Sequence, residues 1–134
     1  MGFDVYGKKP KNKKGEYFRN NVWWWRRLWQ FVCAICPDLI KQEEVESGQM
    51  NNGQAFSAVR AVAIATRIDK AINTGTATVW KKEIDKEIKK IKKHNKKKKS
   101  GDKGFIWGAE YPFTIQNLKN FSKFCRSSGG FEIC

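Results

Sequence analysis

The sequence is poor in the residues on which several classes of protein depend. It has a single histidine, three prolines, and 13 acidic residues against 27 lysines and arginines. No apolar run reaches the roughly 18 residues that a membrane-spanning helix needs, and the N-terminal residues lack the apolar segment of a secretory signal. We therefore expect a cytoplasmic protein that does not enter a membrane.

The excess of basic residues gives a net charge of +14, which favours an anionic partner. Apolar residues make up 40% of the chain and aromatic residues 13%, which is too much for a disordered basic tail. At 134 residues the chain is long enough for one hydrophobic core and short for two. The composition predicts a single basic domain, residues 1–134.

Apolar residues recur at helical spacing in four segments. In the first, the apolar face contains Trp24, Trp25 and Trp29, and Asn20 or Asn21 is expected to cap the first turn. The predicted helices are 22–36, 54–74, 79–95 and a last one from its cap Thr114 to the stop at 127–130.

Short strands complete the predicted fold. Residues 3–6 and 131–134 alternate between apolar and polar and are natural partners in a sheet. Residues 104–108 are predicted as a short strand or a buried turn, and residues 41–53 as a polar loop. The lysine-rich segment 89–103 is expected to be a frayed helix end that runs into a mobile loop. The sum is a mainly helical α+β domain with about four helices and two or three short strands.

Three motifs carry a resemblance to a known family. Residues 15–26 read GEYFRNNVWWWR and residues 129–133 read GGFEI, with GFDVYG at 2–7. These segments resemble a family of small uncharacterised phage and prophage proteins, over nearly the whole chain. The chain departs from the family at Arg27, where the family has proline, and in its long lysine run. The resemblance implies no particular activity; it implies a phage origin, the host cytoplasm, and a role in host interaction or in blocking host defence.

Basic and aromatic residues are interleaved between Arg19 and Trp29. Guanidinium groups bind phosphates and indole rings stack on bases, which are the two contacts that a nucleotide or a single strand requires. Trp23 falls on the same side of the predicted helix as Arg26 and Arg27, whereas the neighbouring tryptophans fall on the core stripes. The alternative for all of them is ordinary core packing. The candidate ligand-binding residues are Arg19, Asn20, Asn21, Trp23, Arg26, Arg27, Asn51 and Asn52.

Asn51 and Asn52 are included because, with Gly53, they precede a helix whose first N–H groups can bind an anion. An asparagine cap beside a flexible glycine is the structural alternative. A polar pocket floored by tryptophans would form if this turn lay beside residues 19–21.

Lys96, Lys97, Lys98 and Lys99 are predicted phosphate contacts, which would give salt-dependent binding without sequence preference. The alternative is a solvated loop whose lysines have no function. Reading of base edges in a groove is not expected, because the run has almost no Asn, Gln or Arg.

The cysteines suggest two further sites. Cys33 and Cys36 form a CxxC at the C-terminal end of the predicted helix, where the helix dipole does not stabilise a thiolate, so a redox dithiol is not expected. A zinc site would need two more ligands from His94, Cys125 and Cys134, and only half of the usual spacing is present. We expect plain thiols and no metal.

Catalytic constellations are sparse. His94 has no obvious Ser-His-Asp or Cys-His partners, and no Walker-type loop occurs. Two of the carboxylates Asp4, Glu16, Glu110 and Glu132 could converge, yet nothing in their spacing requires it. We therefore predict a protein without enzymatic activity or cofactor that binds nucleic acid or a nucleotide. The alternative from another class is a protein-binding inhibitor of a host or defence protein.

Overall fold

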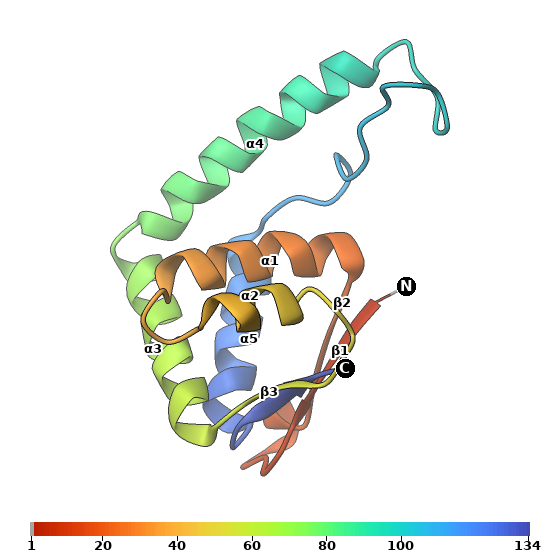
Figure 1. The fold of residues 1–134 in the computed structure, drawn as a ribbon. Helices are drawn as coiled ribbons and strands as arrows, with labels where there is room; N and C mark the ends of the chain where they lie inside the picture. The colour runs from red at the N-terminus through yellow and green to blue at the C-terminus, as the bar shows by residue number, and fades with distance from the viewer. Residues whose placement is uncertain (1) are drawn as a thin grey trace.

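The computed structural model describes residues 2–134, and Figure 1 shows their arrangement. Four strands form an antiparallel sheet in the order β2-β1-β4-β3. Val5 lies opposite both Phe18 and Ile133, so the two ends of the chain are paired as predicted. The strands are β1 (Gly2–Gly7), β2 (Tyr17–Asn21), β3 (Gln54–Phe56) and β4 (Phe131–Ile133).

Within the described residues the chain also forms five α-helices, which confirms a mainly helical α+β domain. Helices α1, α3 and α5 gather beside the sheet, whereas α4 crosses above α1 and extends away from it (Figure 1). The helices are α1 (Val22–Ile35), α2 (Gln42–Ser47), α3 (Ala58–Asn73), α4 (Thr76–Asn95) and α5 (Ile115–Ser127), with a 3-10 turn η1 (Lys13–Gly15).

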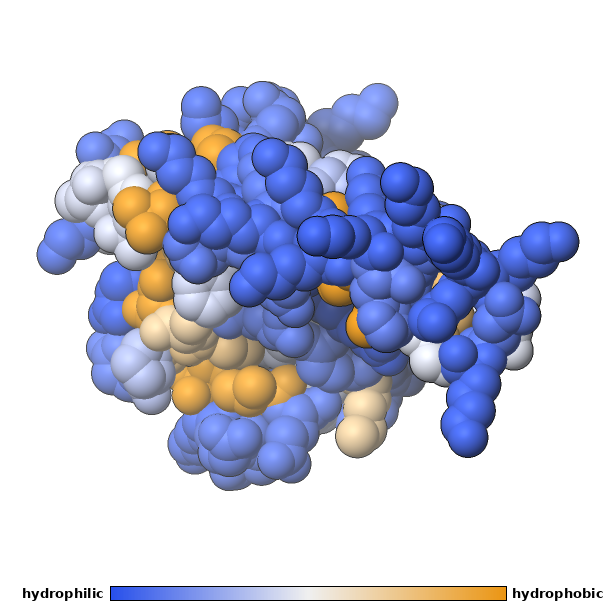
Figure 2. Space-filling view, turned by 90° about the horizontal axis from the view of Figure 1, so that it is seen from above, coloured by the Kyte–Doolittle hydropathy of each residue, from blue (hydrophilic) through white to orange (hydrophobic). Residues whose placement is uncertain are grey.

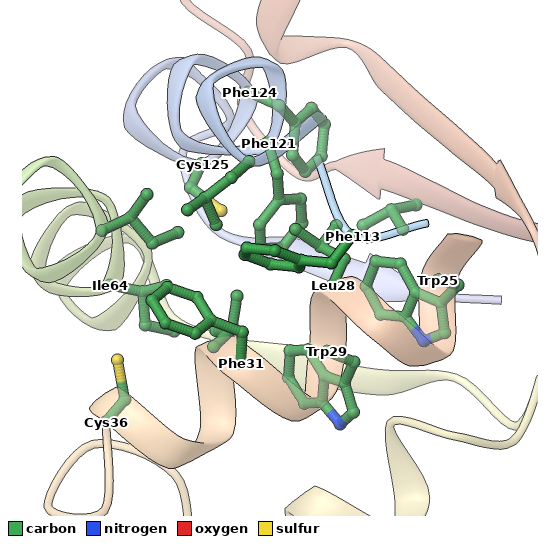
Figure 3. Close-up of a cluster of buried hydrophobic side chains, with 14 of the residues drawn as sticks. Trp25, Leu28, Trp29, Phe31, Cys36, Ile64, Phe113, Phe121, Phe124 and Cys125 are labelled. Atoms are coloured by element: carbon green, nitrogen blue, oxygen red, sulfur yellow. The ribbon is translucent and has the colours of Figure 1, made fainter. Parts of the chain in front are cut away.

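Aromatic side chains form much of the core, as Figure 3 shows for the part between α1, α3 and α5. The ring of Trp25 stacks between those of Phe3 and Trp29, at centroid distances of 5.6 and 5.4 Å. Both indole N–H groups donate to backbone carbonyls, Trp25 to Gly48 at 2.7 Å and Trp29 to Val45 at 3.0 Å. The two tryptophans therefore pack in the core and also fix the segment around α2. Trp24, which we had assigned to the core, is only half-buried because it lies at the border of the apolar face.

Side chains at the helix starts explain where the helices begin. Asn21 accepts from the backbone N–H groups of Trp23 and Trp24 at 3.1 and 3.0 Å, so it is the predicted cap of α1. Thr114 caps α5 in the same way, with its hydroxyl 3.1 Å from the N–H of Asn117.

The structure corrects the prediction of a loop over residues 41–53, because residues 42–47 form α2. This short helix depends on tertiary contacts. Glu44 is buried, with its carboxylate 2.6 Å from the guanidinium of Arg60 on α3. The sequence of α2 is acidic and polar, which is typical of a loop. The helix can be predicted only when the pairing of Glu44 with Arg60 is known.

Three other segments differ from the prediction. Residues 54–56, predicted as the start of a helix, form the edge strand β3, and Ser57 caps α3 after them. Residues 17–21 form β2, which was not predicted. Residues 104–108 are neither strand nor buried turn; their backbone is irregular, and Ile106 and Trp107 are exposed.

Helix α4 continues to Asn95, so the first half of the lysine-rich segment 89–103 is helical and only residues 96–103 lie in a loop. On α4, Asp85 forms an ion pair with Lys81, at 2.7 Å. Phe31 of α1 packs edge-on against Trp80 of α4, with ring centroids 5.3 Å apart. Over residues 2–134, no helix has the length and apolar character required to span a membrane.

Candidate nucleic-acid interface

The most basic part of the molecule is the far end of α4 and the loop after it. Residues 88–103, which we call the lysine arm, contain nine lysines and one acid, Asp102, giving +8 of the net charge of +14. None of these lysines takes part in an ion pair within the described chain. Viewed from above, hydrophilic side chains cover most of this side of the molecule (Figure 2). The arm is therefore a dense and uncompensated positive surface.

Side chains at the end of α4 fix the path of the chain after the arm. The Asn95 side chain donates to the carbonyl of Ile106 at 2.6 Å and accepts from its N–H at 3.0 Å. Nε2 of His94 lies 2.6 Å from the carbonyl oxygen of Gly104. These contacts bring residues 105–107 back beside α4, so that an aromatic segment lies at the base of the lysine arm.

A cavity of about 280 Å³ lies at this base, between α1, α4 and the returning segment. We call it the Trp/Arg cavity. The side chain of Trp107 is 54% exposed there, and the Phe105 ring packs edge-on against it with centroids 5.0 Å apart. The residues that line the cavity are Trp23, Arg26, Arg27, Gln30, Glu87, Ile91, Ile106 and Trp107.

The two arginines of the cavity differ in their partners. The guanidinium carbon of Arg26 lies 5.0 Å from the ring centroid of Trp23, and this side chain is exposed. Arg27 donates from Nε to the carbonyl of Tyr111 at 3.2 Å, so it is engaged in holding the returning segment. Glu87 is the one acid in the lining. Arg26 is therefore the cavity's available cation for an anionic group.

The structure brings three of the predicted ligand-binding residues together, Trp23, Arg26 and Arg27. Arg19 lies outside the cavity, on the outer face of the sheet, where its Nε is 3.0 Å from the carboxylate of Asp4. Its position follows from β2, which the sequence analysis did not predict.

The predicted asparagines have structural partners. Asn20 and Asn117 exchange two amide hydrogen bonds at 3.0 and 2.9 Å, which join β2 to α5. Asn51 donates to the carbonyl of Gly2 at 3.2 Å, and Gly2 is the strand partner of Asn21. The turn at residues 51–53 does lie near the start of α1, as supposed. The side chains of Asn20 and Asn51, however, make hydrogen bonds that connect parts of the fold.

Asn52 accepts from the hydroxyl of Ser47 at 2.9 Å and does not reach the cavity. Lys96, Lys97 and Lys99 are exposed at the tip of the lysine arm, and Lys98 is half-buried. All four predicted phosphate contacts thus lie in the loop that begins at the end of α4.

Sequence reasoning missed Trp107 and Ile106 as site residues. The segment GFIWG was predicted as a short strand or a buried turn, because three consecutive apolar residues favour either structure. The available signal was the pair of flanking glycines, Gly104 and Gly108, which both have positive φ angles, +82° and +96°. Because glycine adopts such angles readily, the two glycines favour an irregular loop over a strand.

Two of the four cysteines, Cys36 and Cys125, are buried, and Cys33 and Cys134 are half-buried. Burial raises the pKa of Cys33 to about 12 and that of Cys36 to about 11. In the part of the chain that the structure describes, no three His, Cys, Asp or Glu side chains are grouped so that they could hold a metal ion.

Of the four carboxylates considered as an acid/base pair, Asp4 and Glu132 lie on the neighbouring strands β1 and β4, whereas Glu16 and Glu110 lie outside the helices and strands. Asp4 binds Arg19 and accepts a short hydrogen bond from the hydroxyl of Tyr17, which is the main cause of a raised Tyr17 pKa. Glu132 lies on β4, and Glu110 is exposed in the segment that precedes α5.

Comparison with known proteins provides no relative, since no family model, no curated protein and no solved structure matches this chain.

Proposed function

We propose that this protein binds single-stranded nucleic acid, without catalysing a reaction, as a phage-type accessory protein. The phage assignment depends on the resemblance of its sequence motifs alone. One observation carries the binding proposal: the Trp/Arg cavity, with its exposed Trp107, lies at the base of the lysine arm. A backbone lying along the arm would bring its bases to the cavity.

The two parts supply different contacts. Lysines of the arm neutralise backbone phosphates and release counterions, which gives affinity that falls with salt. Stacking on Trp107 contributes about 1–3 kcal/mol for one base and depends little on its identity. Arg26 lies over Trp23 with its guanidinium exposed, so it can hold a phosphate next to the stacked base.

A single strand fits these groups better than a duplex. An indole can stack only on a base that is unpaired or splayed out of a helix. The arm itself has no arginine or glutamine and one asparagine, Asn95, whose amide is occupied by Ile106. The side chains that read base edges in the major groove are therefore lacking on this surface.

The first experiment is a fluorescence titration of an oligothymidylate across salt concentrations. We expect Trp107→Ala to weaken binding about 5- to 150-fold, the equivalent of one lost stacked base. Trp107→Tyr retains a ring and should recover most of the affinity. An unchanged Kd in Trp107→Ala would contradict the proposed site.

The lysine arm is tested by its effect on the salt slope. Lys97→Ser with Lys99→Ser removes two exposed lysines and should reduce the slope of log K against log salt by about 1.4 if both contact phosphates. The matched control is Lys41→Ser with Lys70→Ser, two exposed lysines elsewhere on the surface, which should leave the slope unchanged. Equal slopes for both pairs, or no binding at physiological salt, would overturn the proposal and favour a protein partner.

A further inference from the structure

A second basic cavity lies between α3, α5 and η1, and its volume is about 400 Å³. It is separate from the Trp/Arg cavity and shares no residue with it. Four cationic side chains line it around a central acid, Asp69. These cations are Lys14, Lys119, Lys123 and Arg126.

The negative charge of Asp69, the acid in this cavity, is compensated by a neighbouring cation. Asp69 receives a hydrogen bond from the buried hydroxyl of Ser122 at 2.6 Å, and the guanidinium of Arg126 lies 2.8 Å from its other oxygen. No ion pair of the described chain includes Lys14, Lys119 or Lys123. Three positive charges therefore face the same hollow without a counter-charge, which is an environment that favours an anion such as phosphate.

One exposed aromatic ring, Tyr17, adjoins these lysines. A neighbouring cavity of about 210 Å³ shares Lys14 and Lys123 with the first and is lined by Tyr17, Phe18 and Phe124. The side chain of Tyr17 is 46% exposed. Cations beside an exposed ring repeat the composition of the Trp/Arg cavity, where Arg26 and Trp107 line the same hollow.

The two basic regions lie at opposite ends of the molecule. The connection between β1 and β2, which contains η1, is at the bottom of Figure 1, and the loop of the lysine arm is at the top. The helical domain separates them, so one short strand lying on the arm does not cover the η1 region.

We propose that the cavity between α3, α5 and η1 is a second site for a nucleic-acid backbone, so that one molecule bridges two strands. This inference rests on the proposed function, because it assigns the lysine arm to the first strand. Lys14, Lys119 and Lys123 hold a phosphate of the second strand, and Tyr17 provides a face for an adjoining base. Binding at this site is independent of sequence, since lysines act as point charges.

A capture assay tests the bridge. One oligothymidylate is immobilised, the protein is added, and retention of a second, labelled oligothymidylate is measured. Lys119→Glu with Lys123→Glu should reduce retention at least about tenfold, because each reversal places a carboxylate where a phosphate binds. Both lysines are exposed, so these substitutions leave the core intact.

A charge-matched control is Lys41→Glu with Lys70→Glu, which changes the net charge by the same amount at two exposed positions elsewhere. The two double variants should bind the immobilised strand with Kd values within about twofold of each other. Only the Lys119/Lys123 variant should lose the second strand.

The outcomes separate this inference from the proposed function. If the wild-type protein binds the first strand and retains no second strand, the bridge is wrong and the proposed function stands. If the protein binds neither strand at physiological salt, the proposed function is wrong. Bridging that persists in the Lys119/Lys123 variant would mean that the second strand is held by a second copy of the chain, which light scattering would reveal, and would also overturn this inference.

Discussion

The backbone of Gly108 lies directly against the indole of Trp23. A Cβ atom at residue 108 would be 2.8 Å from Cε3 of this ring, closer than carbon atoms in proteins approach. Gly108 also has a φ of +96°, in the region that side-chain-bearing residues rarely adopt. The wall of the Trp/Arg cavity is therefore set by the absence of a side chain at this position.

We expect Gly108→Ala to destabilise the fold by about 1–3 kcal/mol and to displace Trp23 from its place under Arg26. Gly101→Ala is the matched control, since Gly101 has a similar φ of +95° and nothing within 4 Å of an added Cβ. Urea unfolding of both variants separates backbone strain, which they share, from the clash with Trp23. Equal losses of stability would mean that this contact is unimportant.

Asn95 should be required for the position of Trp107. Its side chain makes two hydrogen bonds with the backbone of Ile106, and Asn95→Ala removes both. We expect hydrogen exchange of the Ile106 amide to become about five- to tenfold faster, together with weaker binding of oligothymidylate. Asn73→Ala, at an exposed position near the end of α3, should change neither quantity. Unaltered exchange at Ile106 would show that other contacts hold the segment.

Local patterns in the sequence predicted most of the fold. The apolar spacing of α1 and the caps Asn21 and Thr114 are local signals, and all three are confirmed. The alternation at both ends predicted the β1–β4 pair. The predictions failed for α2 and β3, whose partners are distant in the sequence. Helix α2 needs Arg60, which lies 16 residues beyond Glu44, and β3 needs β4.

In the candidate site, too, local patterns placed some residues correctly, and the rest depend on distant contacts. Trp23, Arg26 and Arg27 share one side of a helix, so their helical periodicity placed them together. Trp107 joins them only because the segment after α4 folds back, and no periodicity spans that distance. Arg19 was included because it begins the basic and aromatic run, and Asn51 because it precedes a helix, but their actual partners are Asp4 and Gly2.

The Glu44–Arg60 pair should make stability depend on pH in the acid range. Hydrogen bonds from Arg60 lower the pKa of Glu44 below its ordinary value of 4.5. Because the folded state favours the ionised carboxylate, the contribution is complete above about pH 5 and is lost as the pH falls through the lowered pKa. We expect Glu44→Gln to cost about 2–3 kcal/mol at pH 7 and progressively less on acidification.

Glu43→Gln is the control for that measurement, since Glu43 precedes Glu44 in the same helix but is exposed. It should change the free energy of unfolding by less than about 0.5 kcal/mol at any pH. A difference between wild type and Glu44→Gln that stays constant from pH 7 to pH 3 would contradict the assignment of the lowered pKa to this pair.

The thiols of Cys33 and Cys36 should react slowly in the folded protein. Their pKa values of about 12 and 11 mean that the nucleophilic thiolate is a very small fraction at pH 8. Alkylation by iodoacetamide should accelerate about tenfold for each pH unit between 8 and 10, because the thiolate fraction rises by that factor below the pKa. In urea all four cysteines should react alike, since unfolding removes the burial that raises these values. Rapid alkylation at pH 7, or a Cys33–Cys36 disulfide in air, would instead restore a redox role for this CxxC.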